Sequence, residues 1–147
     1  MLLEFSKNLK KDAVPRQIIN DLKNIDNQYP DLTIHMGVGG YKDYKYTYYR
    51  PALVYMGNPY YIDFPIYMAY QNANMVDRKQ ITQIFEACKI DIWLIPKGNI
   101  PFSLENFAVK HIPLFDQELR NSFLNNYVQI NTSKFFDIYK CKIHKEF

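Results

Sequence analysis

The sequence predicts a single α/β domain: a three-layer, Rossmann-like sandwich with a mainly parallel central sheet of about four strands. Segments with helical apolar spacing alternate along the chain with short apolar runs, a pattern typical of sheets covered by helices. Several of these runs are continuously apolar, as expected of parallel strands buried on both faces. At 147 residues, the chain is long enough to bury one core, so we expect one domain over residues 1–147.

The N-terminal part of the chain predicts a helix followed by a strand. Residues 15–28 repeat apolar side chains at helical spacing, and Pro15 suits the first turn of a helix. Tyr29-Pro30-Asp31 is expected to end this helix. A short strand is predicted over residues 32–36, closed by the glycines that follow it.

The middle of the chain predicts a strand and two helices. The strand is expected over residues 51–56, where an apolar run ends at Gly57-Asn58-Pro59. A short helix is predicted over residues 66–72. Asp77 suits the N-cap of a second helix that runs to about Cys88, since a carboxylate can accept hydrogen bonds from free amide groups.

The last part of the chain predicts strand, helix and strand. Residues 90–95 form the strongest predicted strand, and Pro96-Lys97-Gly98 breaks it. A helix is expected from residue 116 to about 128. Residues 135–143 alternate as a final strand, which we place at an edge of the sheet because one of its faces mixes apolar residues with lysines.

Charge and cysteine content limit the possible functions. The net charge of +3 permits an anionic partner but falls short of the basic surface of a nucleic-acid binder, so no nucleic-acid partner is expected. Cys88 and Cys141 form no CxxC motif; a disulfide between them is possible, and two free buried thiols are the preferred interpretation. No apolar run approaches the roughly 20 residues of a membrane-spanning helix.

The most informative segment runs from Gly37 to Arg50, where a glycine turn leads into interleaved tyrosines and cations. Glycines at the end of a strand allow a close backbone approach to phosphate or sugar. Tyrosine faces can stack on sugar rings, and an Arg fork can bind phosphate or carboxylate. Alternatively, the glycines form a tight structural turn, the tyrosines pack against a neighbouring element and the lysines are solvated.

Two further residues are expected near the same rim of the sheet. Asp63 follows the predicted strand at 51–56 and can bind sugar hydroxyls or act as a base, although an N-cap for the next helix is preferred. Lys97 is a plausible phosphate contact, whereas Trp93 is expected in the core. The predicted ligand-binding residues are Gly37, Gly39, Gly40, Tyr41, Lys45, Tyr49, Arg50, Asp63 and Lys97.

The sequence offers no pattern for metal or nucleophilic chemistry. His35, His111 and His144 are scattered without a metal-ligand spacing, so no zinc site is expected. No serine lies in a GxSxG elbow, and neither cysteine has an activating motif. We therefore expect no cofactor and assign no catalytic residue.

Four stretches resemble a known family: HMGVGGYKDYKYTYYRPALVYMGNPYYIDFPIYMAYQNANM, DIWLIPKGNIPFSLENF, PLFDQELRNSFLNNY and FFDIYKC. They are similar to the extracytoplasmic C-terminal region of bacterial multi-spanning glycosyltransferases of the lipid-linked-sugar type. The resemblance covers most of the chain from about Pro15. It implies a sugar-related context, a membrane-embedded transferase segment as a possible partner, and a place on the extracytoplasmic face of a membrane if the chain is part of a longer protein.

Three functions follow as hypotheses. The first is a domain associated with a membrane glycosyltransferase, which binds a glycan or sugar-phosphate or shapes access to the active site. The second is a small stand-alone enzyme that uses a nucleotide sugar, with the glycine turn at the diphosphate. The third is a protein-interaction module whose tyrosine-rich patch is the interface.

Overall fold

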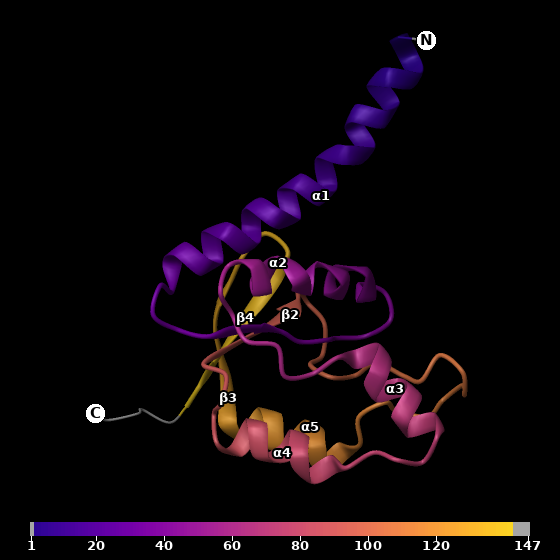
Figure 1. The fold of residues 1–147 in the computed structure, drawn as a ribbon, viewed down its shortest axis with the longest axis vertical. Coiled ribbons are helices and arrows are strands. Elements are labelled where there is room, and N and C mark those ends of the chain that lie inside the picture. The colour runs from indigo at the N-terminus through magenta and orange to yellow at the C-terminus, as the bar shows by residue number, and fades with distance from the viewer. Residues whose placement is uncertain (1, 143–147) are drawn as a thin grey trace.

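The computed structural model describes residues 2–142, with side chains from Val14 onward, and shows helices around one central sheet (Figure 1). The elements follow in the order α1 (Leu2–Gln28), β1 (Ile34–Met36), the 3-10 helix η1 (Tyr44–Tyr49), α2 (Arg50–Tyr55), α3 (Phe64–Asn72), α4 (Arg78–Glu86), β2 (Ile92–Pro96), α5 (Gln117–Asn126), β3 (Tyr127–Thr132) and β4 (Phe136–Cys141).

The sheet has four strands in the order β1-β2-β4-β3, and it is mixed. Only β1 and β2 are parallel, with Ile34 opposite Ile92, whereas β4 runs antiparallel to both β2 and β3. The prediction of a mainly parallel sheet is therefore wrong. The reason is local: β3 and β4 follow each other as a hairpin, and a short connection can join only antiparallel strands.

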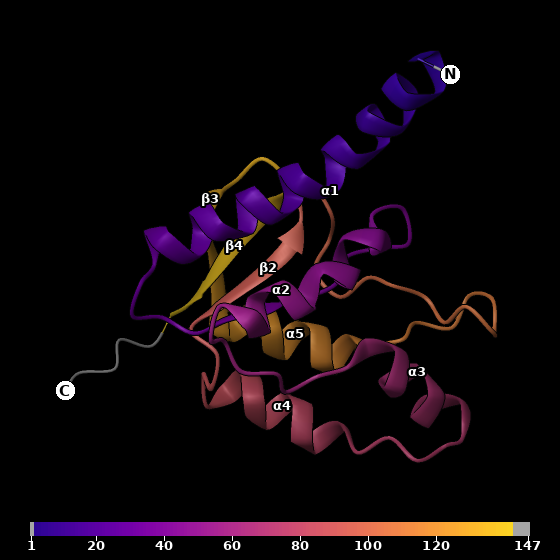
Figure 2. The same ribbon diagram turned by 45° about the horizontal axis from the view of Figure 1, so that its top comes forward.

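Helices cover both faces of the sheet, which confirms the α/β class (Figure 2). Alternate residues of β2 point to opposite faces, as the pleat requires. Ile92 and Leu94 join the core under α1 and α2. Trp93 and Ile95 join the larger core, to which α3, α4 and α5 contribute. Trp93 is fully buried, as predicted.

The predicted helices α3 and α4 are confirmed together with their N-caps, although α3 begins two residues earlier than predicted, at Phe64, and α4 ends at Glu86. Asp63 is the N-cap of α3 and accepts a hydrogen bond from the Ile66 amide at 3.0 Å. Asp77 is the N-cap of α4 and accepts one from the Lys79 amide at 3.1 Å. A carboxylate at this position satisfies an amide group that has no partner within the helix.

The predicted strand over residues 51–56 is wrong, because this segment forms α2. A six-residue apolar run cannot be assigned to strand or helix by periodicity alone. In α2 only Leu53 is buried, while Val54 and Tyr55 face solvent. Pro51 lies in the first turn, where its missing amide hydrogen costs no helical bond.

The C-terminal hairpin differs from its prediction in two ways. The helix expected to reach residue 128 ends at Asn126, and the chain passes directly into β3. Only Tyr127 of β3 is buried, so this edge strand lacks the apolar alternation that signals a strand. The strand β4, expected at an edge, lies inside the sheet between β2 and β3. Residue 143, the last of the predicted strand, lies outside the described residues.

The first helix is longer than predicted. The sequence places Pro15 in the first turn, but α1 begins at Leu2 and contains Pro15 in its interior. Figure 1 shows that the N-terminal part of α1 extends beyond the rest of the protein. Ile18, Leu22 and Ile25, from the later part of α1, are buried against the sheet, as their spacing predicts.

The two cysteines form a disulfide, so the preference for free thiols is wrong. Cys88 follows α4 and Cys141 ends β4, and their Cα atoms lie 6.0 Å apart. This separation is typical of disulfide-bonded cysteines. Residues separated by 53 positions become neighbours only through the fold, which sequence spacing could not show.

Candidate ligand-binding site

The glycine turn after β1 packs against the loop that follows β2. The amide of Gly37 donates to the Leu94 carbonyl at 2.8 Å, and the amide of Gly40 donates to Asn99 Oδ1 at 2.9 Å. A Cβ atom on Gly39 would lie 2.6 Å from the same Asn99 oxygen. The absence of a side chain at Gly39 therefore allows this turn to approach the loop after β2 closely.

Asn99 also holds the segment that enters η1. Its Nδ2 donates to Asp43 Oδ2 at 2.7 Å, while its oxygen accepts from Gly40. One side chain thus bridges both ends of residues 40–43, and this short segment is fixed relative to the sheet. The residues that begin the tyrosine-rich run are thus held in place through Asn99 and the glycine turn.

The 3-10 geometry of η1 divides the tyrosines among three faces. Side chains three residues apart nearly eclipse one another in such a helix. Tyr44 and Thr47 are buried, and Tyr46 and Tyr49 pack against the core under α1. Lys45 and Tyr48, the third such pair, are exposed.

The exposed face contributes to a surface groove of about 590 Å³. We call it the lysine–tyrosine groove, and its lining residues are Tyr41, Lys42, Tyr44, Lys45, Tyr48 and Phe107. Tyr41 is 76% exposed and Tyr48 is 61% exposed. The groove thus combines flat aromatic rings with two ammonium groups, which suits a ligand with a ring and a negative charge.

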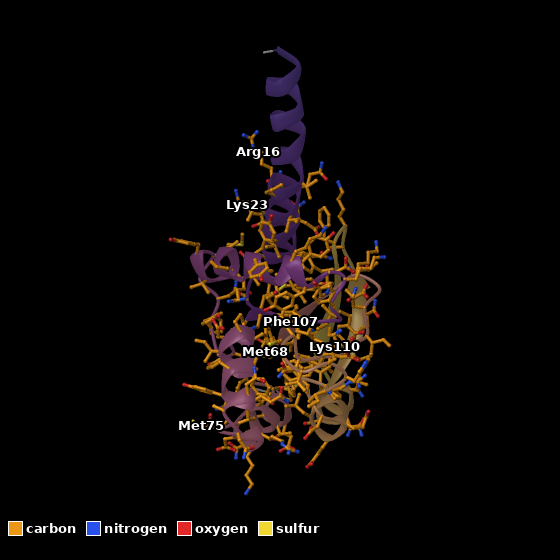
Figure 3. All side chains as sticks on the ribbon, turned by 90° about the vertical axis from the view of Figure 1, so that its right-hand side faces the viewer. Arg16, Lys23, Met68, Met75, Phe107 and Lys110 are labelled. Carbon is orange, nitrogen blue, oxygen red and sulfur yellow. A yellow bond between two sulfur atoms is a disulfide. The ribbon has the colours of Figure 1, made fainter. Side chains whose placement is uncertain are left out.

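Phe107 closes the groove from a segment distant in sequence, the connection between β2 and α5. Figure 3 faces this side of the molecule and labels Phe107. Its ring meets those of Tyr41 and Tyr44 edge to face, at centroid distances of 5.4 and 5.1 Å. Such contacts stabilise a defined orientation of the rings. Phe107 could not be predicted from the sequence, because its loop has no regular spacing to follow.

The charges of Lys42 and Lys45 are open to solvent. Neither forms an ion pair with any of the described residues. Lys45 Nζ lies 5.5 Å from the ring centroid of Tyr46, and Asp43, between the two lysines, turns one carboxylate oxygen to Asn99. Their ammonium groups are therefore available to an anion.

Arg50 and Asp63, which do not line this groove, pair with each other. Arg50 Nη2 lies 3.3 Å from Asp63 Oδ2. Arg50 Nε donates to the Tyr60 hydroxyl at 2.7 Å, and that hydroxyl is hydrogen-bonded to Asp63. The guanidinium and the carboxylate thus already have partners within the protein.

Burial and charge set the pKa values of this cluster. Burial would raise the pKa of Asp63, but hydrogen bonds from Tyr60 and the Ile66 amide, together with Arg50, lower it below 3.8 overall. Burial raises the pKa of Tyr44, and the charges of Arg50 and Asp63 also act on this phenol. Arg50 lowers the pKa of Tyr44 and Asp63 raises it, so the two charges act in opposite directions and burial is the main cause of the shift.

His35 lies behind this cluster as a buried, neutral side chain. Its Nδ1 hydrogen-bonds the Met36 carbonyl at 2.8 Å, so Nε2 is the acceptor for the amides of Tyr61 and Ile62, at 3.1 and 3.3 Å. Burial lowers the pKa of His35 to about 4. It supports the segment between α2 and α3.

The predicted site residues thus fall into five groups. Tyr41 and Lys45 line the groove, and Arg50 pairs with Asp63. Tyr49 packs toward α1. Lys97 Nζ donates to the Ser133 carbonyl of the β3–β4 connection at 3.1 Å. The remaining three, Gly37, Gly39 and Gly40, form the supporting turn.

The part of the chain that the structure describes contains neither a group of metal ligands nor a helix that could span a membrane. No three His, Cys, Asp or Glu residues within it are grouped to hold a metal ion, and His144 lies outside that part. None of its helices combines the length and apolar character needed to cross a bilayer. No family model, curated protein or solved structure matches this chain.

Proposed function

We propose that this chain is a domain that works beside a membrane glycosyltransferase and binds an anionic sugar, such as a sugar phosphate, in the lysine–tyrosine groove. The observation that carries the proposal is the convergence of exposed rings with the ammonium groups of Lys42 and Lys45, which form no ion pair with the described residues. Tyrosine faces can stack on the C–H face of a sugar, and the ammonium groups can bind its phosphate or carboxylate.

The resemblance to the extracytoplasmic region of lipid-linked-sugar transferases supports the choice of a sugar. The disulfide between Cys88 and Cys141 supports the expected location, because disulfides persist mainly in oxidising compartments outside the cytoplasm. A membrane-embedded transferase segment remains the proposed partner. A Rossmann-like relationship also remains a proposal, supported by the parallel β1–β2 pair.

The stand-alone nucleotide-sugar enzyme is less well supported. A diphosphate loop needs free backbone amides directed at the phosphates. Here the amides of Gly37 and Gly40 donate to Leu94 and Asn99. The role of the glycine turn is accordingly better explained by loop packing.

A protein-interaction module is the second candidate, because several large side chains of α2 and α3 face solvent. Tyr55 is 93% exposed, and Val54, Ile66 and Tyr70 are exposed with it. Such residues can form the centre of an interface. This candidate predicts self-association or capture of the transferase segment with no response to small sugars.

Calorimetric titration with hexose phosphates tests the proposal. We expect the wild type to bind, and Lys42→Ala/Lys45→Ala to weaken binding by about tenfold or more, since each charged hydrogen bond contributes roughly 1.5–3 kcal/mol before solvent screening. Tyr55→Ala is the matched control, because Tyr55 is exposed but does not line the groove. Absence of heat with every hexose phosphate, or equal binding by the double variant, would reject the groove.

A further inference from the structure

A second cavity lies between α3 and α4, outside the lysine–tyrosine groove. It encloses about 290 Å³. We call it the tyrosine cleft, after the residues of its wall and rim: Tyr60, Tyr61, Tyr67, Tyr70, Asp77 and Gln80. We propose that the tyrosine cleft binds one neutral sugar ring, as a second subsite for the glycan.

Helical spacing explains how the cleft forms. In α3, Phe64 and Met68 face the core, so Ile66, Tyr67 and Tyr70 are left on the side toward α4. On α4, Gln80, Ile81 and Ile84 line the cavity. Ile81 and Ile84 are buried and contribute an apolar floor beneath a polar rim.

The wall of the cleft is held in place by contacts behind it. Tyr67 stacks on Phe115 with ring centroids 5.0 Å apart. Tyr60 stacks on buried His35 at 5.8 Å and is hydrogen-bonded to Arg50 and Asp63. A wall with fixed rings loses little conformational entropy when a ligand binds.

The polar rim retains hydrogen-bonding capacity. Asp77 Oδ1 accepts from the Lys79 amide, but Oδ2 has no hydrogen bond to any other described residue. The same is true of the Gln80 amide and the Tyr70 hydroxyl within residues 14–142. Together they offer donors and acceptors in a small space, which matches the adjacent hydroxyls of a sugar.

The charge around the cleft favours a neutral ligand. The lining contains no Lys, Arg or His among the described residues. Arg78, next to the rim residue Asp77, forms an ion pair with Asp116, and Asp63 is paired with Arg50. The carboxylate of Asp77 therefore repels an anion, in contrast to the two lysines of the groove. The C–H groups of a neutral ring can pack against the negative faces of the tyrosines.

Saturation-transfer NMR with methyl hexopyranosides tests this inference. The panel contains the gluco, manno, galacto and N-acetylglucosamine forms, with cyclohexylmethanol as a ring that lacks the hydroxyl array. We expect transfer to at least one sugar and a loss of about fivefold or more in affinity in Tyr70→Ala/Gln80→Ala, since one lost hydrogen bond contributes about 1 kcal/mol. Tyr55→Ala, whose changed side chain lies outside the cleft, should behave as wild type.

The inference rests on the proposed glycan function, but the two can fail separately. Lys42→Ala/Lys45→Ala should lose hexose phosphate and keep the neutral sugar. A second variant, Asp77→Asn, keeps an N-cap residue while it changes one rim acceptor, and it should weaken the sugar without lowering the thermal midpoint. No transfer to any pyranoside, equal affinity in the rim variants, or equal binding of cyclohexylmethanol would overturn the inference.

Discussion

Arg50 Nη2 lies 3.3 Å from Asp63 Oδ2, and this ion pair joins the first residue of α2 to the N-cap of α3. The two residues are 13 positions apart in the chain, and the segment that His35 supports lies between them. The pair therefore fastens the connection between α2 and α3, and both of its residues had been predicted from the sequence to bind a ligand.

Replacement of Asp63 by Asn should cost about 1 kcal/mol of unfolding free energy at neutral pH, because the ion pair is lost while the N-cap is kept. The pKa of Asp63 is lowered in the fold. Its contribution is thus complete above the unfolded value of 3.8 and is lost as the pH falls through the folded value. Urea unfolding below pH 4 checks this: Asp63→Asn should lack that acid loss, and an identical loss in the variant would contradict the assignment.

His35 predicts a separate pH dependence. Its pKa falls from 6.5 to about 4 in the fold, so folding favours the neutral ring. The contribution of His35 to the free energy of unfolding is complete above pH 6.5 and should decline as the pH falls toward 4, by about 3 kcal/mol at most. His35→Gln keeps an acceptor but does not titrate, and its unfolding free energy should stay flatter over this range. Equal slopes in the two proteins would show that His35 is not the titrating group.

The two adjacent glycines give a matched pair of variants. A Cβ at Gly39 would collide with Asn99, whereas one at Gly40 would meet Ser103 at an ordinary 3.4 Å. Gly39→Ala should lose about 1–3 kcal/mol, the usual cost of overpacking, and Gly40→Ala should lose less. Thermal unfolding of both variants tests this order of stability. A lower midpoint for Gly40→Ala than for Gly39→Ala would contradict the prediction.

The disulfide should dominate the response to reductant. Cross-linking positions 53 residues apart stabilises by roughly 4 kcal/mol in the chain-entropy model. Dithiothreitol should therefore lower the urea midpoint of the wild type but leave that of Cys88→Ala/Cys141→Ala unchanged. A wild-type midpoint that does not respond to full reduction would contradict a stabilising cross-link.

Local signals in the sequence were sufficient for part of this structure. The N-caps Asp63 and Asp77 and the buried strand around Trp93 were predictable because short-range chemistry determines them. Residues 51–56 and the strand β3 were not, because tertiary packing decides between helix and strand in short runs. The sheet order and the disulfide depend on long-range contacts that no local pattern encodes.

The candidate site also contains some residues that local sequence signals predict and others that only long-range contacts bring together. The sequence drew attention to Tyr41 and Lys45, which line the groove. It also grouped Arg50 and Lys97 with them, although Arg50 pairs with Asp63 and Lys97 turns to Ser133. Phe107 and Asn99 complete the groove and its support through contacts from distant loops, so only the fold could identify them.

Amide NMR of the wild type, titrated with a hexose 1-phosphate, tests the central claim most directly. The proposed function predicts that the largest shifts map to residues 41–48 and to Phe107, and that they weaken as salt is added, because exposed charges are screened. In Lys42→Ala/Lys45→Ala these shifts should disappear while the spectrum stays folded. Shifts that persist in the double variant, or that map away from the groove, would contradict the account.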